Sequence, residues 1–170
     1  MKKVGLYLIA FLVSISCNLS DDGVPCALPD GSSVDIIVQS MYIELVDANG
    51  TNLIANDTYP GLDISAEKDG FIIRPVVFDE SQIPNLPKSV KDIIVLELLG
   101  PEGENTWVLK LNENENDTLA IDLKHGNADE CGLFLLEVLS ATYNGVQQNV
   151  EPFAVFDTDS KIDFKITVVK

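Results

Sequence analysis

Short apolar runs with a period of two, separated by turn residues, constrain the fold of this chain more than any other feature. In the last run, Phe164, Ile166 and Val168 alternate with charged or hydroxyl-bearing neighbours. Such alternation places the apolar side chains on one face of a strand, which is then buried while the other face meets water. Asn144-Gly145 stands between two extended runs, and this dipeptide is the strongest short signal for a β-hairpin.

Similar runs recur about every ten residues, which is the spacing of strands in an all-β domain. We expect extended segments over 34–47, 51–55, 62–66, 71–78, 91–99, 106–111, 118–123, 133–143, 146–150, 152–156 and 162–169, some of them joined, which gives about 8 to 10 strands. The chain has no repeated strand-helix rhythm of an α/β fold. The sequence therefore predicts a single antiparallel β-sandwich, immunoglobulin-like or transthyretin-like.

Three of these runs carry irregularities. The apolar phase slips near Gln39-Ser40, which predicts a bulge or a break there. Pro75 cannot donate to a ladder, so its run should lie at a sheet edge or be interrupted. The run 91–99 admits a helix capped by Ser89, but its consecutive β-branched residues favour a buried strand.

The first residues have the order of a secretory signal. Lys2 and Lys3 precede an apolar run from Val4 to Val13, which is far shorter than the roughly 20 residues that span a bilayer. Ser16 and Cys17 follow this run. We expect a signal peptide over 1–16, a tether over 17–32 and one sandwich domain over 33–170.

Val13-Ser14-Ile15-Ser16-Cys17 resembles a bacterial lipobox, although Ser14 stands where Leu is usual. The resemblance implies that Cys17 becomes the first residue of the mature chain and carries a covalent lipid, with no other cofactor. The alternative is a plain cleaved signal peptide with an incidental cysteine. Asn18 to Gly23 forms an acidic tether that looks like the export tag of Bacteroidota surface lipoproteins, and an ordinary solvated linker is the alternative.

Charge excludes one class of partner. Without residues 1–16 the chain keeps nine basic and 27 acidic residues, a formal charge of −18. Such a balance repels nucleic acid and anionic lipid surfaces and favours solubility. We therefore expect no nucleic-acid partner, and contact with a membrane only through a lipid anchor.

Three cysteines is an odd count for an exported protein. Lipidation of Cys17 would leave Cys26 and Cys131 to form a disulfide in an oxidising compartment. A bridge that closes a loop of about 100 residues stabilises a fold by about 4 to 5 kcal/mol in the chain-entropy account. Two buried free thiols are the alternative.

Cys131-Gly132-Leu133-Phe134-Leu135, followed by Tyr143-Asn144-Gly145 and a final strand, is similar to the carboxy-terminal half of small Bacteroidota lipoproteins of unassigned role. The resemblance implies an outer-membrane lipoprotein of the cell envelope. Exposure at the cell surface is one of the two placements that it allows. It brings no functional residue with it.

Few residues are candidates for chemistry. Trp107 and the loop residue Tyr59 could stack on a sugar, but alternation places Trp107 with core leucines. Glu113, Glu115 and Asp117 offer alternate oxygen ligands for Ca²⁺, although the run lacks the glycine and final glutamate of the helix-flanked loop. A hairpin tip whose polar residues face water is the favoured alternative.

Asp117-Thr118-Leu119 resembles the acceptor that Bacteroidota use for O-glycosylation of exported proteins, which would place sugar on Thr118. The chain has no glycine-rich phosphate loop and no nucleophile elbow, so we expect no enzymatic activity. The expected function is a non-catalytic binding or structural module with a carbohydrate or protein partner. A carbohydrate-binding accessory module and a hydrolase with paired carboxylates are the alternatives.

Overall fold

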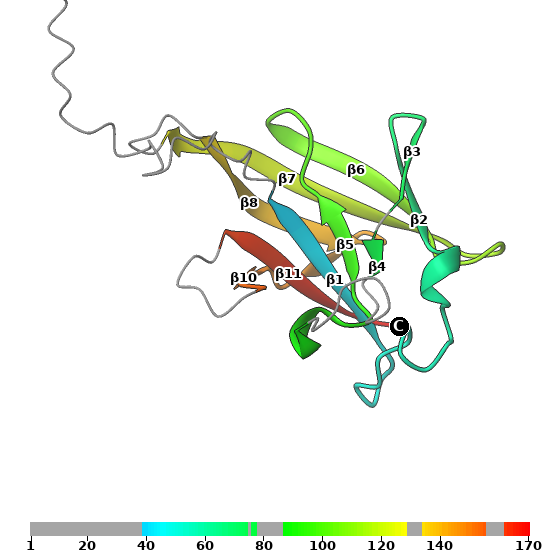
Figure 1. The fold of residues 1–170 in the computed structure, drawn as a ribbon. Coiled ribbons are helices and arrows are strands. Elements are labelled where there is room, and N and C mark those ends of the chain that lie inside the picture. The colour runs from blue at the N-terminus through cyan, green and yellow to red at the C-terminus, as the bar shows by residue number, and fades with distance from the viewer. Residues whose placement is uncertain (1–38, 75, 78–86, 129–133, 156–161) are drawn as a thin grey trace, which may run out of the picture. The chain divides into compact units, whose positions relative to one another are not determined.

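The structure is a computed structural model that describes residues 39–74, 76–77, 87–128, 134–155 and 162–170, and it is an all-β sandwich (Figure 1). Its strands are β1 (Ser40–Val46), β2 (Ser65–Lys68), β3 (Phe71–Ile73), β4 (Val76–Val77), β5 (Ile94–Glu97), β6 (Gly103–Lys110), β7 (Asn116–Ala128), β8 (Phe134–Tyr143), β9 (Val146–Gln148), β10 (Glu151–Phe153) and β11 (Asp163–Val169). Two single-turn 3₁₀ helices, η1 (Gly61–Asp63) and η2 (Lys88–Val90), lie in the connections. The sandwich predicted from the sequence is confirmed.

Five strands form one sheet in the order β10-β11-β1-β5-β4, and six form the other in the order β3-β2-β6-β7-β8-β9. One pair departs from the antiparallel arrangement that we expected. β1 and β11 run parallel, with Met41 opposite Phe164 and Val46 opposite Val169. A parallel pair needs a crossover of a dozen or more residues, and these two strands are separated by most of the domain.

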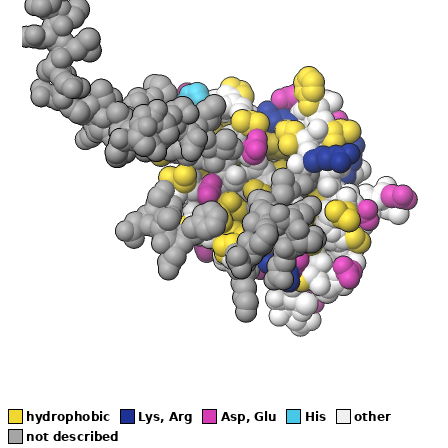
Figure 2. All heavy atoms as spheres, in the orientation of Figure 1, with side chains coloured by type: hydrophobic (Ala, Val, Ile, Leu, Met, Phe, Trp, Pro, Cys, Tyr) yellow, Lys and Arg dark blue, Asp and Glu magenta, His cyan; other side chains and the backbone are white. Residues whose placement is uncertain are grey.

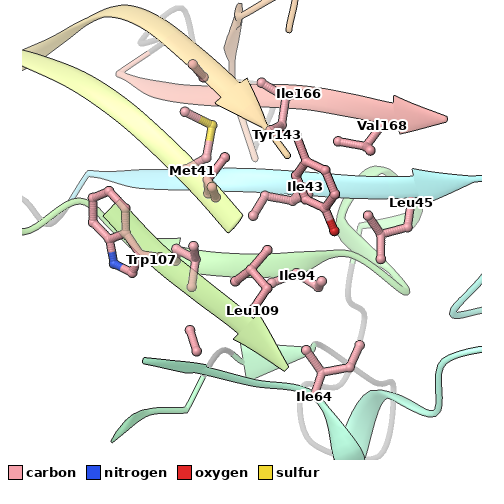
Figure 3. Packing of buried hydrophobic residues seen from close by; sticks show 14 of the residues in the cluster. Met41, Ile43, Leu45, Ile64, Ile94, Trp107, Leu109, Tyr143, Ile166 and Val168 are labelled. Atoms are coloured by element: carbon pink, nitrogen blue, oxygen red, sulfur yellow. The ribbon is translucent and has the colours of Figure 1, made fainter. Parts of the chain in front are cut away.

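The core lies between the sheets and is built from the period-two pattern (Figure 3). Met41, Ile43 and Leu45 of β1 have no exposed surface, and the inward residues of β6, β7 and β11 pack against them. A second, smaller cluster lies on the outer side of β1, where Tyr42 packs with Val90 and residues near η2. Both faces of β1 are therefore covered. In the strand order β1 is also the central strand of its sheet.

The prediction of a strand over 51–55 is wrong. Only an isolated bridge between Val46 and Asn52 forms, and a turn follows. The side-chain oxygen of Asn52 accepts the backbone N–H groups of Ile54 at 2.8 Å and Ala55 at 2.9 Å. Such local bonds give the backbone an alternative to a ladder, so the segment turns while Leu53 and Ile54 stay buried.

Two other expected strands change their bounds. The run over 62–66 divides into η1 and β2, and the run over 71–78 divides into β3 and β4, which are edge strands of different sheets. The interruption predicted from Pro75 is therefore confirmed, although Pro75 itself lies outside the described residues. The run over 91–99 contains β5, so the strand was the correct choice, and the 3₁₀ turn η2 precedes it.

The hairpin predicted at Asn144-Gly145 is confirmed between β8 and β9. Both turn residues have positive φ, 49° for Asn144 and 76° for Gly145. Two consecutive positive φ values define the type I′ turn, whose twist matches that of the flanking strands. Among the described residues, no helix has the length and apolar character needed to span a membrane.

Trp107 gives a test of the core. Its indole ring is fully buried, with Lys68 Nζ 5.4 Å from the ring centroid, and its N–H has no hydrogen-bond partner among the described residues. We expect Trp107→Ala to lower the free energy of unfolding by about 3 to 5 kcal/mol, because it leaves a large cavity. Trp107→Phe should cost clearly less, because no hydrogen bond is lost.

Urea denaturation measures both changes, and Leu62→Ala is the matched control because the Leu62 side chain is 94% exposed. The control should shift the free energy of unfolding by no more than about 0.5 kcal/mol. An equal loss of unfolding free energy in Trp107→Phe and Trp107→Ala would contradict the statement that the indole N–H contributes no hydrogen bond.

Candidate functional site

One end of the sandwich gathers polar side chains from both sheets and from three connections between strands. We call this group the polar cluster, and its members are Tyr59, Glu115, Asp117, Tyr143, Asn144 and Lys170. Three of them stand at strand ends: Asp117 near the start of β7, Tyr143 at the end of β8 and Lys170 directly after β11. The other three lie in connections: Tyr59 between β1 and β2, Glu115 between β6 and β7, and Asn144 between β8 and β9.

Strand alternation directs the charged side chains of Asp117 and Lys170 toward the core. Asp117 has the parity of the buried Leu119 and Ile121 on β7, and Lys170 has the parity of the buried Ile166 and Val168 on β11. Successive side chains of a strand alternate between faces, so both charged groups are carried to the core side. A buried charge is costly unless it is paired and hydrogen-bonded.

Lys170 meets this requirement by bridging two carboxylates. Its Nζ donates to Oε1 of Glu115 and to Oδ2 of Asp117, and the Lys170 side chain is only 15% exposed. The ammonium also lies 5.0 Å from the ring centroid of Tyr59 and 6.0 Å from that of Tyr143. These rings limit the access of water to the amine, and their faces attract the cation.

The two carboxylates receive further donors. The Tyr59 hydroxyl lies 2.9 Å from Oε2 of Glu115, and the Tyr143 hydroxyl donates to Oδ2 of Asp117 over 2.7 Å. Asn144 Nδ2 donates to Oδ1 of Asp117, also over 2.7 Å. The side-chain oxygen of Asn144 accepts the backbone N–H of Thr118, which fixes the direction of the amide.

These contacts determine the charge state of the central pair. Burial alone would raise the pKa of Asp117, but hydrogen bonds from Asn144, Lys170 and Tyr143 outweigh it and hold this pKa below its usual value. Burial alone would lower the pKa of Lys170, but Asp117 and Glu115 outweigh it and raise this pKa. Both Asp117 and Lys170 are therefore ionised at neutral pH.

The two phenols remain hydrogen-bond donors over a wide pH range. Burial is the main cause that raises the pKa of Tyr143, and the neighbouring Asp117 raises it further. Burial also raises the pKa of Tyr59, with the hydrogen bond to Glu115 as the second cause. The cluster is therefore a set of fixed donors around two anions.

The acidic run before β7 does not assemble as a calcium loop. Glu113 is exposed, whereas Glu115 and Asp117 turn toward the ammonium of Lys170. Among the described residues no group of three or more His, Cys, Asp or Glu side chains could hold a metal ion. The favoured alternative, polar residues that merely face water, is also wrong for Asp117, which is buried.

The two aromatic residues considered for sugar contact are both inside the domain. Trp107 has no exposed surface and Tyr59 is 7% exposed. Alternation placed Trp107 in the core correctly, whereas the loop position of Tyr59 suggested an exposure that it does not have. Neither ring can stack on a carbohydrate, because each is already covered by its own chain.

The remaining candidate residues divide into two groups. Thr118 is exposed on the outer face of β7, so its hydroxyl is open to modification, and its glycosylation stays a prediction. Cys17, Cys26 and Cys131 lie outside the described residues, so lipidation and the disulfide also stay predictions.

A groove lies near the start of β1 and β11 and has a volume of about 360 Å³. Its lining is Gln39, Gly126, Leu135, Leu136, Glu137, Ile162 and Phe164. Gln39 joins the two sheets there: its Nε2 donates to the carbonyl oxygens of Leu136 at 3.0 Å and Ile162 at 2.8 Å, and its Oε1 accepts from the Leu136 N–H. The carboxamide thus connects backbone groups of the two sheets.

Asp163, the first residue of β11, has a raised pKa. Burial is the main cause, and the Ser40 N–H, which donates to Oδ1 over 2.8 Å, offsets part of it. Burial also raises the pKa of Tyr42 to about 12, with Asp163 as the second cause. The ionised form of the Asp163 carboxyl group is therefore disfavoured by its surroundings.

No protein-family model, curated protein or solved structure matches the chain. The interpretation of the site therefore depends on its geometry. The finer fold expectation, immunoglobulin-like or transthyretin-like, and the resemblance to Bacteroidota lipoproteins both stay predictions.

Asn144 tests the polar cluster. Asn144→Ala removes the donor to Asp117 and the acceptor for Thr118, and it places a β-carbon at a positive φ. We expect the free energy of unfolding to fall by about 1 to 3 kcal/mol. Asn144→Gly separates the causes, because glycine accepts positive φ but still lacks the amide.

Chemical denaturation gives these values, with Asn149→Ala as the control because Asn149 is exposed and its amide donates to Glu151, which is outside the polar cluster. A stability of Asn144→Gly equal to that of the unchanged chain would show that the amide contributes nothing.

Asp163 gives a pH-dependent test. A carboxyl group with a raised pKa binds its proton more tightly in the folded state, so stability is lost as pH rises from the usual value of 3.8 through the raised pKa. Asp163→Asn stays neutral and keeps an acceptor for the Ser40 N–H. We expect this variant to be more stable than the unchanged chain at pH 7, and the difference to vanish below pH 3.8.

Thermal denaturation between pH 3 and pH 8 measures the difference. The control is Asp57→Asn, an exposed residue in a turn with positive φ that asparagine also accepts. A pH-independent difference for Asp163→Asn would rule out ionisation of this group as its cause.

Proposed function

We propose that the chain is an exported, lipid-anchored protein of a bacterial cell envelope, and that its β-sandwich acts as a non-catalytic binding or structural module. The proposal has two parts, a location and a mode of action. The mode of action is supported by the polar cluster, and the location by the first residues of the sequence.

The saturation of the polar cluster is the observation that carries the mode of action. Each of the four carboxylate oxygens of Glu115 and Asp117 accepts at least one hydrogen bond from the protein itself, with Lys170 as the donor to Oε1 of Glu115 and Tyr59 as the donor to Oε2. A general acid or base must present a lone pair or proton to a substrate. Glu115 and Asp117 direct their carboxylates to groups of their own chain rather than to an external substrate, and so hold the two sheets together at this end.

The location follows from the arrangement of the first seventeen residues. Two lysines, a short apolar run and a small residue before Cys17 are the parts of a lipoprotein signal. A single acyl chain binds a membrane only marginally, so a lipidated cysteine with several chains would anchor the domain stably.

The surface charge is compatible with a domain that stands away from the membrane. On the face shown in Figure 2, acidic side chains are dispersed among uncharged ones and do not gather in one patch. Dispersed negative charge keeps a tethered domain soluble and repels anionic headgroups.

The two alternatives receive less support. A carbohydrate-binding module would use exposed aromatic rings, and both rings considered for that role are buried. A hydrolase would use two carboxylates across a cleft, whereas Glu115 and Asp117 share one ammonium. The partner of a binding module would have to be sought on another face.

The test of the proposal is the state of Cys17 in cells. We expect mass spectrometry of the chain from a bacterium that processes lipoproteins to give an N-terminal peptide that begins at Cys17 and carries acyl chains. Protease treatment of intact cells then reports whether the domain is exposed at the surface.

Cys17→Ser is the matched control. It should lose the acyl chains and leave the membrane fraction, while the thermal unfolding of the domain stays unchanged. Recovery of full-length chain that keeps residues 1–16 in the cytosol would overturn the proposed location.

A further inference from the structure

We propose that Lys170 and Asp117 condense to an intramolecular amide, and that Glu115 transfers the proton that this reaction requires. The product would join the end of β11 to the start of β7 and so link the two sheets covalently. This inference does not depend on the proposed function, since it concerns only groups within the domain.

The nucleophile and its target are already in contact. Lys170 Nζ touches Oδ2 of Asp117 on one side and Oε1 of Glu115 on the other. The side chains of Lys170 and Asp117 are 15% and 7% exposed, and the Tyr59 and Tyr143 rings flank the amine. Reacting groups held in this way have effective concentrations of about 10⁵ to 10⁸ M, far above any intermolecular reaction in water.

The carboxyl group of Asp117 has separate donors on its two oxygens. Asn144 Nδ2 lies 2.7 Å from Oδ1, where negative charge would develop when nitrogen attacks the carbon. A fixed donor at that position stabilises the tetrahedral intermediate. The Tyr143 hydroxyl lies 2.7 Å from Oδ2, the oxygen that would leave.

Glu115 stands where a proton carrier is needed. Its Oε1 touches Lys170 Nζ, and the Tyr59 hydroxyl, 3.0 Å from the same oxygen and 2.9 Å from Oε2, holds the carboxylate in place. Positioned carboxylates of this kind act as general bases and then as general acids. Nucleophile, base, orienting group and oxyanion donor therefore all come from the polar cluster.

The atoms and charges balance without a further reactant. The ammonium of Lys170 gives one proton to Oδ2 of Asp117, and the resulting amine attacks the carboxyl carbon to form the C–N bond. Glu115 takes a second proton from the nitrogen and passes it to the departing hydroxyl. The C–O bond breaks, one water leaves, and Glu115 is again a carboxylate.

The ionised pair is the resting state before this reaction. The carboxylates raise the pKa of Lys170, so the neutral amine is a minor form. We therefore expect the amide to form slowly, after the chain has folded and brought the groups together. Once formed, the amide removes the titrations of both Asp117 and Lys170.

Peptide mapping of the whole purified chain tests the proposal. After storage of the folded protein at pH 7 and digestion with trypsin, we expect the peptide Leu111–Lys124 joined to Ile166–Lys170, lighter by one water than the two peptides together. The same chain kept in denaturant should give the two peptides separately. Separate peptides from the folded chain after prolonged storage would mean a salt bridge only and would overturn the proposal.

Variants assign the roles. Lys170→Arg keeps the cation but lacks the reactive amine, so no joined peptide should form. Glu115→Gln keeps the shape and lacks the base, so linkage should slow by about 10²- to 10⁴-fold. Linkage at the original rate in Glu115→Gln would refute the role given to Glu115.

Two further variants act as controls. Asp117→Asn should give the same joined peptide with loss of ammonia in place of water, because the amide product is identical. Lys165→Arg changes a half-buried ion pair with Glu44, outside the polar cluster, and should link at the original rate. If a variant fails to fold, peptide mapping of the unchanged chain still decides between an amide and a salt bridge.

Discussion

The end of the sandwich that holds the polar cluster depends on one constraint: Asp117 and Lys170 occupy positions at strand ends whose charged side chains point toward the core. Strand alternation directs the side chains of Asp117 and Lys170 toward the core side, because each follows the parity of buried neighbours. An unpaired charge at such a position would be strongly destabilising. The surrounding hydroxyl and amide donors are the response to that constraint, since they satisfy the lone pairs that Lys170 alone cannot.

The parallel pairing of β1 and β11 brings the two halves of this arrangement together. β11 lies beside the central strand β1, so its end reaches the side of the sandwich where β7 begins and β8 ends. At the opposite end, Gln39 connects the sheets through backbone groups of Leu136 and Ile162. Polar contacts thus connect the sheets at both ends, and the apolar core fills the space between them.

The sequence predicted the regular parts of the fold because period-two patterns and the Asn144-Gly145 turn are local signals. It failed at Asn52, where a side chain competes with the ladder, and at Tyr59, whose loop position hid its burial. The parity of Asp117 was readable, and it would have indicated a buried acid. Its pairing with Lys170 was not readable, because the two residues meet only through the tertiary arrangement of two sheets.

The parallel geometry of β1 and β11 also determines how the domain responds to mechanical force. The start of β1 and the end of β11 lie at opposite ends of the pair, so traction between them acts along the strands. The backbone hydrogen bonds are then loaded in shear and must yield together, whereas antiparallel ends would let them unzip one at a time. Resistance of this kind is set by the unfolding rate, so it can be high even in a domain of modest equilibrium stability.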